Sequence, residues 1–362
     1  MSMKKSNVTI KQIAQEAGVS YAAVSMALRD HPEISVKRRQ QIKKIADKLK
    51  YKPNLLVRGL KGKSTHTLGI ITTTLDVETT VVKVQSFERA AREKEYLAMM
   101  AFNPGTADLE DELIIWLMQR GIDGLAIYPI EHGEHKELHR LVNDKFPVVT
   151  FNGKGRLGFD TNDVSVDYYE GGRLQAQHLL EIDRKNVCYI HPKLLFYTIH
   201  QRMLGASDFG RQTGMKIDFI GIEAGDTNDR SRSRLVYHQC REVFKNSIRK
   251  YDAVICSNDV FALASIHALI DIGIKVPDDI AVVGFDDIRA SELSNLSLTT
   301  ISQCTGQVGA SAFDILEKLF HKNKTGKQDE CIRVMIKPKL VVRASTIGRH
   351  WIDDKNECLD ML

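Results

Sequence analysis

The sequence predicts an all-α helix-turn-helix head followed by an α/β, two-lobed body built on doubly wound parallel sheets. Three observations support this fold class. About 60 residues at the start are strongly basic and show helical periodicity around a glycine turn. From residue 67 onward, apolar strand-like runs alternate with helical patterns, an order typical of parallel sheets covered by helices. This part spans nearly 280 residues, which is long for one doubly wound domain and indicates two lobes.

Composition argues against several classes of protein. The chain has 362 residues, 43% of them apolar, which is enough for a substantial core. No run approaches the roughly 18 consecutive apolar residues that a membrane span needs, and the polar start lacks the apolar region of a secretory signal. The six cysteines are far apart and form no C-x-x-C motif. We therefore expect a cytoplasmic protein with reduced thiols and without a metal site.

Charge is distributed unevenly along the chain. Residues 1–63 contain 15 basic and four acidic side chains, a net charge of +11. The remaining residues contain 36 basic and 42 acidic side chains, a net charge of −6. A basic segment on an acidic body is typical of a phosphate-binding module attached to a regulator. A solvated basic tail is the alternative, but the helical periodicity of the segment argues against it.

The basic segment contains the signals of three short helices. Thr9 and Gln12 form a capping box before a first helix, which ends at Gly18, where glycine permits a tight turn. Ser20 is a suitable N-cap for a second helix, and Ser35 for a third. Three short helices that share one small core, with a glycine turn between the first two, predict a helix-turn-helix domain over residues 1–52.

Several phrases of this segment match a known family. They are Val8-Thr9-Ile10-Lys11-Gln12-Ile13-Ala14, Ala17-Gly18-Val19-Ser20 and Val24-Ser25, followed by Tyr51-Lys52-Pro53-Asn54 and Val57-Arg58-Gly59-Leu60. With these residues the chain resembles the lactose-repressor/galactose-repressor (LacI/GalR) family of transcriptional regulators. The match is dense over about 60 residues.

The resemblance implies which residues contact DNA. The second helix lies in the major groove, where the base-reading residues are Tyr21, Ala22, Ser25, Met26 and Arg29, and the phosphate contacts are Thr9, Ser20, Lys37 and Arg38. Many family members have arginine where Met26 stands. We expect apolar contact there, for instance with a thymine methyl, and an operator that differs from the common consensus. The alternative is that Met26 fills the core of the head.

Residues 53–64 are predicted to form a hinge. A segment of about eight residues is too short to be a stable helix in water, and Gly59 lowers its helix propensity further. The resemblance implies that the two hinges of a dimer become helical together in the minor groove through Asn54, Val57 and Leu60. Leu60 would insert between base pairs. An ordinary interdomain linker is the alternative.

The body alternates predicted strands and helices. The strands are 68–73, 97–102, 124–128, 148–152, 187–191, 218–222, 253–257 and 281–285, and the helices include 84–95, 109–120, 170–181 and 259–272. The resemblance continues through Ser257-Asn258-Asp259 and Val283-Gly284-Phe285-Asp286-Asp287. It implies a periplasmic-binding-protein-like effector-binding and dimerisation domain over residues 65–347. Its first lobe would comprise 65–164 and 296–327, its second lobe 165–295 and 328–347, and a tail would follow at 348–362.

The resemblance also implies an effector site between the lobes. Its polar contacts would be Thr198, Arg202, Asn258, Asp286 and Asp76, with a guanidinium and a carboxylate holding the ligand by charge-assisted hydrogen bonds. A purely structural ion pair between Arg202 and Asp286 is the alternative. Aromatic residues common in family sites are absent at Thr227 and Thr305, which leaves open a sugar, another ligand or none.

Two other motifs carry little weight. Gly153, Gly155 and Gly158 spell a dinucleotide fingerprint, but the residues after them have no helical periodicity, so we expect a loop there and no nucleotide site. His135 and His139 are four residues apart, yet the charged residues around them indicate a solvated helix face.

Together these observations predict a sequence-specific transcriptional regulator, most simply a repressor. We expect a homodimer on a near-palindromic double-stranded operator, with its affinity modulated by a sugar-like small molecule. We expect no cofactor, no membrane partner and no enzymatic activity, because no catalytic motif is present. The last residues contain too few apolar positions for a coiled-coil seam, which favours a dimer over a tetramer. A solute-binding protein of transport or chemotaxis is the second hypothesis, opposed by the basic head. An α/β enzyme is the third.

Overall fold

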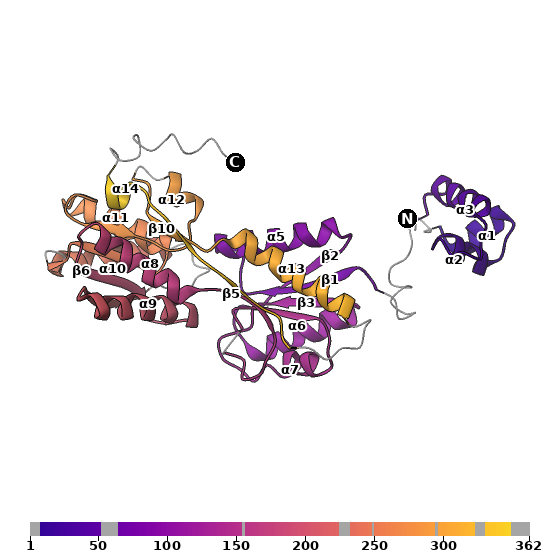
Figure 1. Ribbon diagram of the computed structural model, residues 1–362, viewed down its shortest axis with the longest axis horizontal. Helices are drawn as coiled ribbons and strands as arrows, with labels where there is room; N and C mark the ends of the chain where they lie inside the picture. The colour runs from indigo at the N-terminus through magenta and orange to yellow at the C-terminus, as the bar shows by residue number, and fades with distance from the viewer. Residues whose placement is uncertain are drawn as a thin grey trace, which may run out of the picture. The chain divides into compact units, whose positions relative to one another are not determined.

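The structure, a computed structural model, describes residues 8–51, 64–153, 156–223, 232–247, 250–293, 296–322 and 330–348. The chain divides into two compact units, Met1–Thr65 and His66–Leu362, which we call the head and the body. Figure 1 shows short helices in the head and strands covered by helices in the body. No helix within these described ranges is long and apolar enough to cross a membrane. The five cysteines that lie in them are free thiols.

The head contains three helices, α1 (Ile10–Ala17), α2 (Tyr21–Ala27) and α3 (Val36–Lys48). Each begins at the predicted N-cap, because the hydroxyl oxygens of Thr9, Ser20 and Ser35 accept hydrogen bonds from backbone amides in the first turn. Gly18 ends α1 with a φ of 62°, a conformation that favours glycine. The helices share one small apolar core, made of Ile13, Ala14, Val24, Ala27, Ile42 and Ala46.

The body contains two parallel sheets. The first has the order β11-β5-β4-β3-β1-β2 and the second β7-β6-β8-β9. The strands of the first sheet are β1 (Thr67–Thr72), β2 (Leu97–Phe102), β3 (Gly124–Ile127), β4 (Val148–Phe151), β5 (Asn162–Val166) and β11 (Arg333–Ile336). Those of the second are β6 (Asn186–Pro192), β7 (Lys216–Ile222), β8 (Ala253–Cys256) and β9 (Ala281–Val283).

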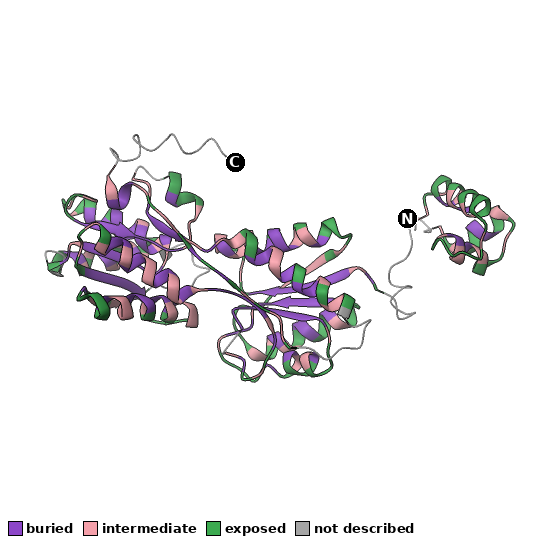
Figure 2. Cartoon of the chain, viewed as in Figure 1, coloured by how far each residue is buried: buried purple, intermediate pink, exposed green. Residues whose placement is uncertain are grey.

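Helices cover both faces of each sheet, and most strands are buried (Figure 2). On the first sheet, α5 (Glu78–Glu93) and α13 (Thr305–Lys322) pack on one face, and α6 (Ala107–Gln119) and α7 (Lys136–Asn143) on the other. On the second sheet, α8 (Tyr168–Glu181) and α9 (Tyr197–Thr213) oppose α10 (Arg232–Ser247) and α11 (Asp259–Asp271). The short α12 (Arg289–Leu293) and α14 (Ala344–Ile347) complete the described helices.

We call the part of the body built on the first sheet the first lobe, and the part built on the second sheet the second lobe. The chain passes between them three times: before α8, after β10 (Thr300–Ser302) and before β12 (Lys339–Val341) (Figure 1). Strands β10 and β12 pair antiparallel. β11 pairs with β5 in the first sheet, whereas the sequence places residues 328–347 in the second lobe. Likewise, residues 299 and 302 bridge to the second lobe at Val283 and Asp286. These strands are three or four residues long, too short for their alternation to indicate which sheet they join.

Observed strands lie within a few residues of the predicted ones, but one helix differs in a way that affects the site. Helix α5 begins at Glu78, six residues before the predicted start at Val84. Its first turns carry Lys83 and Thr79 on the buried side. The structure also adds four strands that were not predicted, β5, β10, β11 and β12; β5 begins four residues after Gly158.

Two glycines let α8 and α9 approach closely. A Cβ at Gly172 would lie 1.9 Å from the carbonyl oxygen of Arg202, and one at Gly205 would lie 1.9 Å from that of Tyr169. Only a residue without a side chain fits either position. Because Arg202 lies at this contact, the packing of the two helices fixes the backbone that carries it.

Candidate functional site

The head presents one face of α2 to solvent. Val24 and Ala27 are buried in the core, whereas Tyr21 and Ala22 are exposed. Met26 is half-buried, and it belongs neither to the core of the head nor to the partly buried apolar residues packed against it. The expected base-reading positions therefore lie on the side of α2 that faces away from the core.

Arg29 lies in the turn that follows α2, two residues after its end. Its Nε donates to the carbonyl oxygen of Ser25 at 2.8 Å, and its Nη2 donates to the Ser25 hydroxyl at 2.9 Å. Both residues belong to the expected base-reading set. The guanidinium is exposed and keeps further donors for a partner.

Internal ion pairs neutralise two of the acidic residues in the head. Asp30 lies 2.7 Å from Lys43 and 3.7 Å from Arg39, and Lys48 lies 3.2 Å from Glu16. The hydrogen bond from Lys43 lowers the pKa of Asp30. Lys37 and Arg38, the expected phosphate contacts, are exposed in the first turn of α3, and Thr9 and Ser20 are exposed N-caps. The expected hinge residues Asn54, Val57 and Leu60 lie outside the described residues.

In the body, Arg202 on α9 is buried beside two aromatic rings. Its guanidinium carbon lies 3.7 Å from the ring centre of Phe285 and 5.0 Å from that of Tyr168. Its Nη1 donates to the carbonyl oxygen of Ser257, and its Nη2 lies 3.6 Å from Asp286 Oδ1. The short distance to Phe285 places the guanidinium against that ring, a favourable contact for a planar cation.

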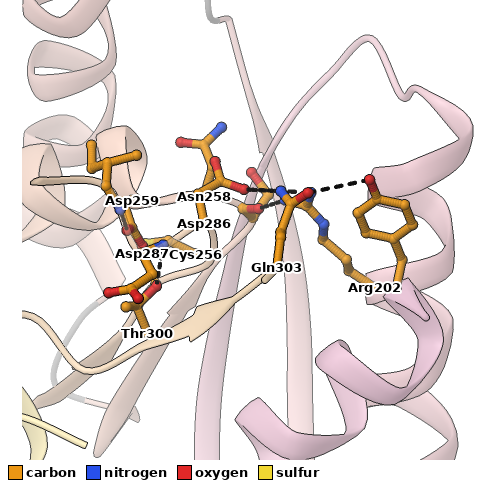
Figure 3. Close-up of polar contacts among 12 residues, drawn as sticks. Arg202, Cys256, Asn258, Asp259, Asp286, Asp287, Thr300 and Gln303 are labelled. Carbon is orange, nitrogen blue, oxygen red and sulfur yellow. Dashed lines mark hydrogen bonds and ion pairs between the residues drawn. The ribbon is translucent and has the colours of Figure 1, made fainter. Parts of the chain in front are cut away.

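A chain of hydrogen bonds connects this pair to the first lobe (Figure 3). Gln303, just after β10, donates through Nε2 to Asp286 Oδ1 at 2.6 Å and accepts from Lys83 Nζ at 2.8 Å. Tyr168 donates to the same Gln303 oxygen at 3.4 Å and accepts from Asn152 at 3.0 Å. We call Lys83, Tyr168, Arg202, Asp286 and Gln303 the interlobe network.

Burial shifts the pKa of two members of this network. Lys83 is 4% exposed, and desolvation lowers the pKa of its ammonium group from 10.5 to about 8, partly offset by Asp286. Desolvation raises the pKa of Tyr168 to about 12. At neutral pH the network therefore holds a charged lysine, a neutral tyrosine and the Arg202–Asp286 pair.

The loop that carries Asp286 is held by a buried carboxylate. Asp259, the first residue of α11, accepts from the Thr300 hydroxyl at 2.5 Å, the Ser291 hydroxyl at 2.7 Å and the Ile288 amide at 3.0 Å. Desolvation raises its pKa to about 6. Asp287 pairs with Arg343 at 2.8 Å. These contacts fix the backbone on both sides of Asp286, whose φ is 128°.

Of the five expected effector contacts, the network contains Arg202 and Asp286. Asn258 caps α11, with its side-chain oxygen accepting from the Phe261 amide at 3.0 Å. Thr198 is half-buried on α9, and Asp76 is exposed and accepts from the Thr74 hydroxyl at 3.1 Å. Lys83, Gln303 and Tyr168 were not predicted as site residues from the sequence. The position of Lys83 on the buried stripe of α5 could have indicated the first of these.

The two weak motifs can also be located. Gly158 is followed by β5 and not by a helix, as expected, and Gly153 follows β4; Gly155 lies outside the described residues. The expectation of a solvated helix face is wrong for His135, which is buried. Its Nδ1 lies 2.6 Å from the buried carboxylate of Glu110. His139 is exposed and stacks on Phe159 at 4.5 Å between ring centres.

Comparison with known proteins assigns the two units to families. Residues 9–54 match the bacterial regulatory proteins of the lacI family, and residues 176–346 match the periplasmic binding protein-like domain. The chain belongs to the LacI family. The predicted family and fold class are therefore confirmed.

Individual relatives of this LacI-family regulator match over nearly their whole length. The HTH-type transcriptional repressor PurR of Histophilus somni (strain 129Pt) is 26% identical over 337 residues, which cover 93% of this chain and 98% of the repressor. The lac repressor dimer bound to operator and the anti-inducer ONPF superposes with a TM-score of 0.81 at 21% identity, over 94% of this chain and 100% of that one. A LacI-family transcriptional regulator from Enterococcus faecium with bound ribose has a TM-score of 0.66 at 18% identity, over 78% and 99%.

Membership fixes the general activity of the chain. It is a DNA-binding transcriptional regulator, and its relatives are repressors and not enzymes.

Proposed function

We propose that this LacI-family chain is a homodimeric repressor that binds a near-palindromic operator and responds to a small molecule bound between the lobes of its body. The observation that carries this proposal is the interlobe network. It places the Arg202–Asp286 pair at the carboxyl ends of the strands, where ligands of parallel sheets bind. It also joins α5 of the first lobe to the loop after β9 in the second lobe, the loop that carries Asp286 (the β9 loop).

In the proposed complex, the exposed face of α2 enters the major groove. Tyr21, Ala22 and Met26 face the base edges, and Arg29 reaches a base or a phosphate beside Ser25. Met26 offers no donor to guanine, so an apolar contact with a thymine methyl suits it. Its position outside the core of the head supports this role.

Phosphates are proposed to bind at the starts of the head helices. The N-caps Thr9 and Ser20 bring backbone amides to the surface, and Lys37 and Arg38 add positive charge at the start of α3. Because Asp30 and Glu16 are already paired within the head, they do not oppose a polyanion strongly.

We assign residues 1–52 to the DNA-binding domain, 53–64 to the hinge and 65–347 to the effector domain. The hinge is proposed to bind the minor groove through Asn54, Val57 and Leu60. Replacing Leu60→Ala should weaken operator binding at least tenfold in a fluorescence-anisotropy titration. Leu194→Ala, which alters a leucine of the body that is 72% exposed, is the matched control. An unchanged affinity for Leu60→Ala would refute insertion at the hinge.

A second copy of the chain is proposed to pack against the body. The edge strand β2 exposes Leu97, Met100 and Phe102, and α6 exposes Trp116. The related lac repressor is a dimer in its complex with operator. Sedimentation of the full chain should give a dimer, and a monomer or a tetramer at micromolar concentration would contradict this part of the proposal.

Ligand and operator are proposed to affect each other through lobe closure. A ligand that contacts both lobes favours one arrangement of them, and the two hinges of a dimer depend on that arrangement. Coupling of this kind is reciprocal, so the operator must change ligand affinity by the same factor by which the ligand changes operator affinity. Measuring both factors by calorimetry tests the proposal, and unequal or absent coupling would contradict it.

A further inference from the structure

The interlobe network holds more positive than negative charge. Lys83 and Arg202 are both buried. The carboxylate of Asp286 forms a 3.6 Å ion pair with Arg202 and is connected to Lys83 through hydrogen bonds of Gln303. The carboxylate of Asp259 is nearby but already accepts three hydrogen bonds, from Ile288, Ser291 and Thr300. A buried charge is costly unless a partner of opposite sign accompanies it. The five-residue network thus has one cation more than it has anions.

Polar atoms around the network also have hydrogen-bonding capacity to spare. Among the described residues, buried atoms without a hydrogen-bond partner include Arg202 Nε, the Ser257 hydroxyl, the Thr72 hydroxyl and the Tyr128 hydroxyl. Thr72 ends β1, Tyr128 follows β3 and Ser257 follows β8, so all three lie at carboxyl ends of strands. Lys83 lies 6.0 Å from the ring centre of Tyr128. Buried polar atoms are normally paired, so these unpaired groups, at carboxyl ends of strands in both sheets, indicate positions that a ligand can satisfy.

We propose that the small molecule recognised by the body carries an oxyanion, a phosphate or a carboxylate, that binds between Lys83 and Arg202. This inference rests on the proposed effector site. The guanidinium of Arg202 offers donors along an edge that suits an oxyanion, and the ammonium of Lys83 supplies a point charge from the other lobe. The hydroxyls of Thr72, Tyr128 and Ser257 match hydroxyl groups on the remainder of the molecule.

A neutral ligand fits these groups less well. It can bridge Arg202 and Asp286, but it leaves the charge of Lys83 without an opposite partner after the last water is excluded. Two cations contributed by the two lobes repel one another when the lobes close, and an anion between them removes that repulsion. The anion therefore favours closure, which a neutral molecule of the same shape does to a smaller degree.

The test uses the full chain and matched ligands. Thermal unfolding is followed with glucose, gluconate and glucose 6-phosphate, with ribose and ribose 5-phosphate, and with inorganic phosphate and sulfate. We expect at least one anionic probe to raise the unfolding midpoint while its neutral parent does not. Comparison of gluconate with the phosphate ester distinguishes a carboxylate from a phosphate.

Variants decide where the anion binds. Lys83→Met should weaken the apparent affinity for the anionic probe at least tenfold. Lys318→Met, at an exposed position on α13, should leave it unchanged. Lys83→Gln, which keeps a donor for Gln303, serves as a second variant, and circular dichroism verifies that each variant is folded.

The possible outcomes separate the two proposals. One outcome is that a neutral compound binds the full chain and Lys83→Met equally well but does not bind Arg202→Met. This result would overturn the anion inference and support the effector site. An anion that binds equally to the full chain and Lys83→Met would also overturn it. If none of these probes shifts the midpoint of the full chain, both the oxyanion and the proposed effector site are contradicted.

Discussion

Replacing the buried lysine of the interlobe network tests the electrostatic account of the body. In Lys83→Met, an apolar side chain of similar length replaces a lysine that is 4% exposed. Burial lowers the pKa of Lys83 from 10.5 to about 8. One pKa unit corresponds to about 1.4 kcal/mol, so the charged form is disfavoured in the folded state by about 3 kcal/mol. The variant should be at least as stable as the parent at pH 7.

The pH dependence gives the sharper prediction. Below pH 8, Lys83 is charged in both the folded and the unfolded state, and the penalty is fully present. As the pH rises through 8 toward 10.5, the folded state releases its proton while the unfolded state keeps it. The folded parent therefore gains stability relative to the variant over this window. Between pH 7 and pH 9.5 the gain should be about 2 kcal/mol.

The neutral groups that face Lys83 keep their protonation state in that window. Gln303 has no group that titrates there. Burial raises the pKa of Tyr168 to about 12 and that of Tyr128 well above 10. Other tyrosines affect parent and variant alike and cancel in the difference.

The assay is urea unfolding of the body, followed by circular dichroism at matched protein concentrations from pH 7 to pH 9.5. Lys318→Met is the control, since the substitution of an exposed lysine should change stability by less than about 0.5 kcal/mol at every pH. A difference between parent and Lys83→Met that stays constant across this range would refute the reasoning, because Lys83 would then titrate alike in both states.

Three further predictions concern packing, DNA binding and the head. Gly172→Ala should destabilise the body by about 3 kcal/mol in urea unfolding, since the new Cβ would lie 1.9 Å from the carbonyl oxygen of Arg202; an unchanged midpoint would contradict the packing of α8 on α9. Lys37→Ala should weaken binding to all duplexes by a similar factor and reduce the salt slope by about one, whereas loss restricted to one sequence would point to a base contact. Asp30→Asn should lower the melting temperature of the head at pH 6. Because Lys43 lowers the pKa of Asp30, the difference from the parent should disappear as the pH falls through that pKa, and a difference that persisted would exclude the ion pair as its source.

Local signals made the head predictable. Thr9, Ser20 and Ser35 occupy the N-caps, and Gly18 has the positive φ that its turn requires. Each of these signals acts within four residues, so the sequence contains the whole of the evidence. The order of the strands in the body could not be predicted from local signals, because pairs such as β11 with β5 join segments about 170 residues apart.

The candidate site was predictable in part. Arg202 and Asp286 stood out through the resemblance to a family, and the structure brings them within 3.6 Å. Lys83 was missed because the predicted helix began one residue after it, which removed it from the apolar stripe on which it lies. Gln303 joins α5 to the β9 loop only after the chain has crossed twice between the lobes, and no periodicity in the sequence reports such a contact.

Selection from random double-stranded DNA tests the central claim most directly. Purified full chain is incubated with a randomised duplex library, the bound fraction is sequenced, and the enriched site is titrated against a scrambled site and heparin at fixed salt. We predict a site with two-fold symmetry that binds at least 1,000 times more tightly than the scrambled duplex, about 4 kcal/mol. A library that shows no enriched sequence, with equal affinity for duplex and heparin, would contradict the claim that α2 reads DNA bases.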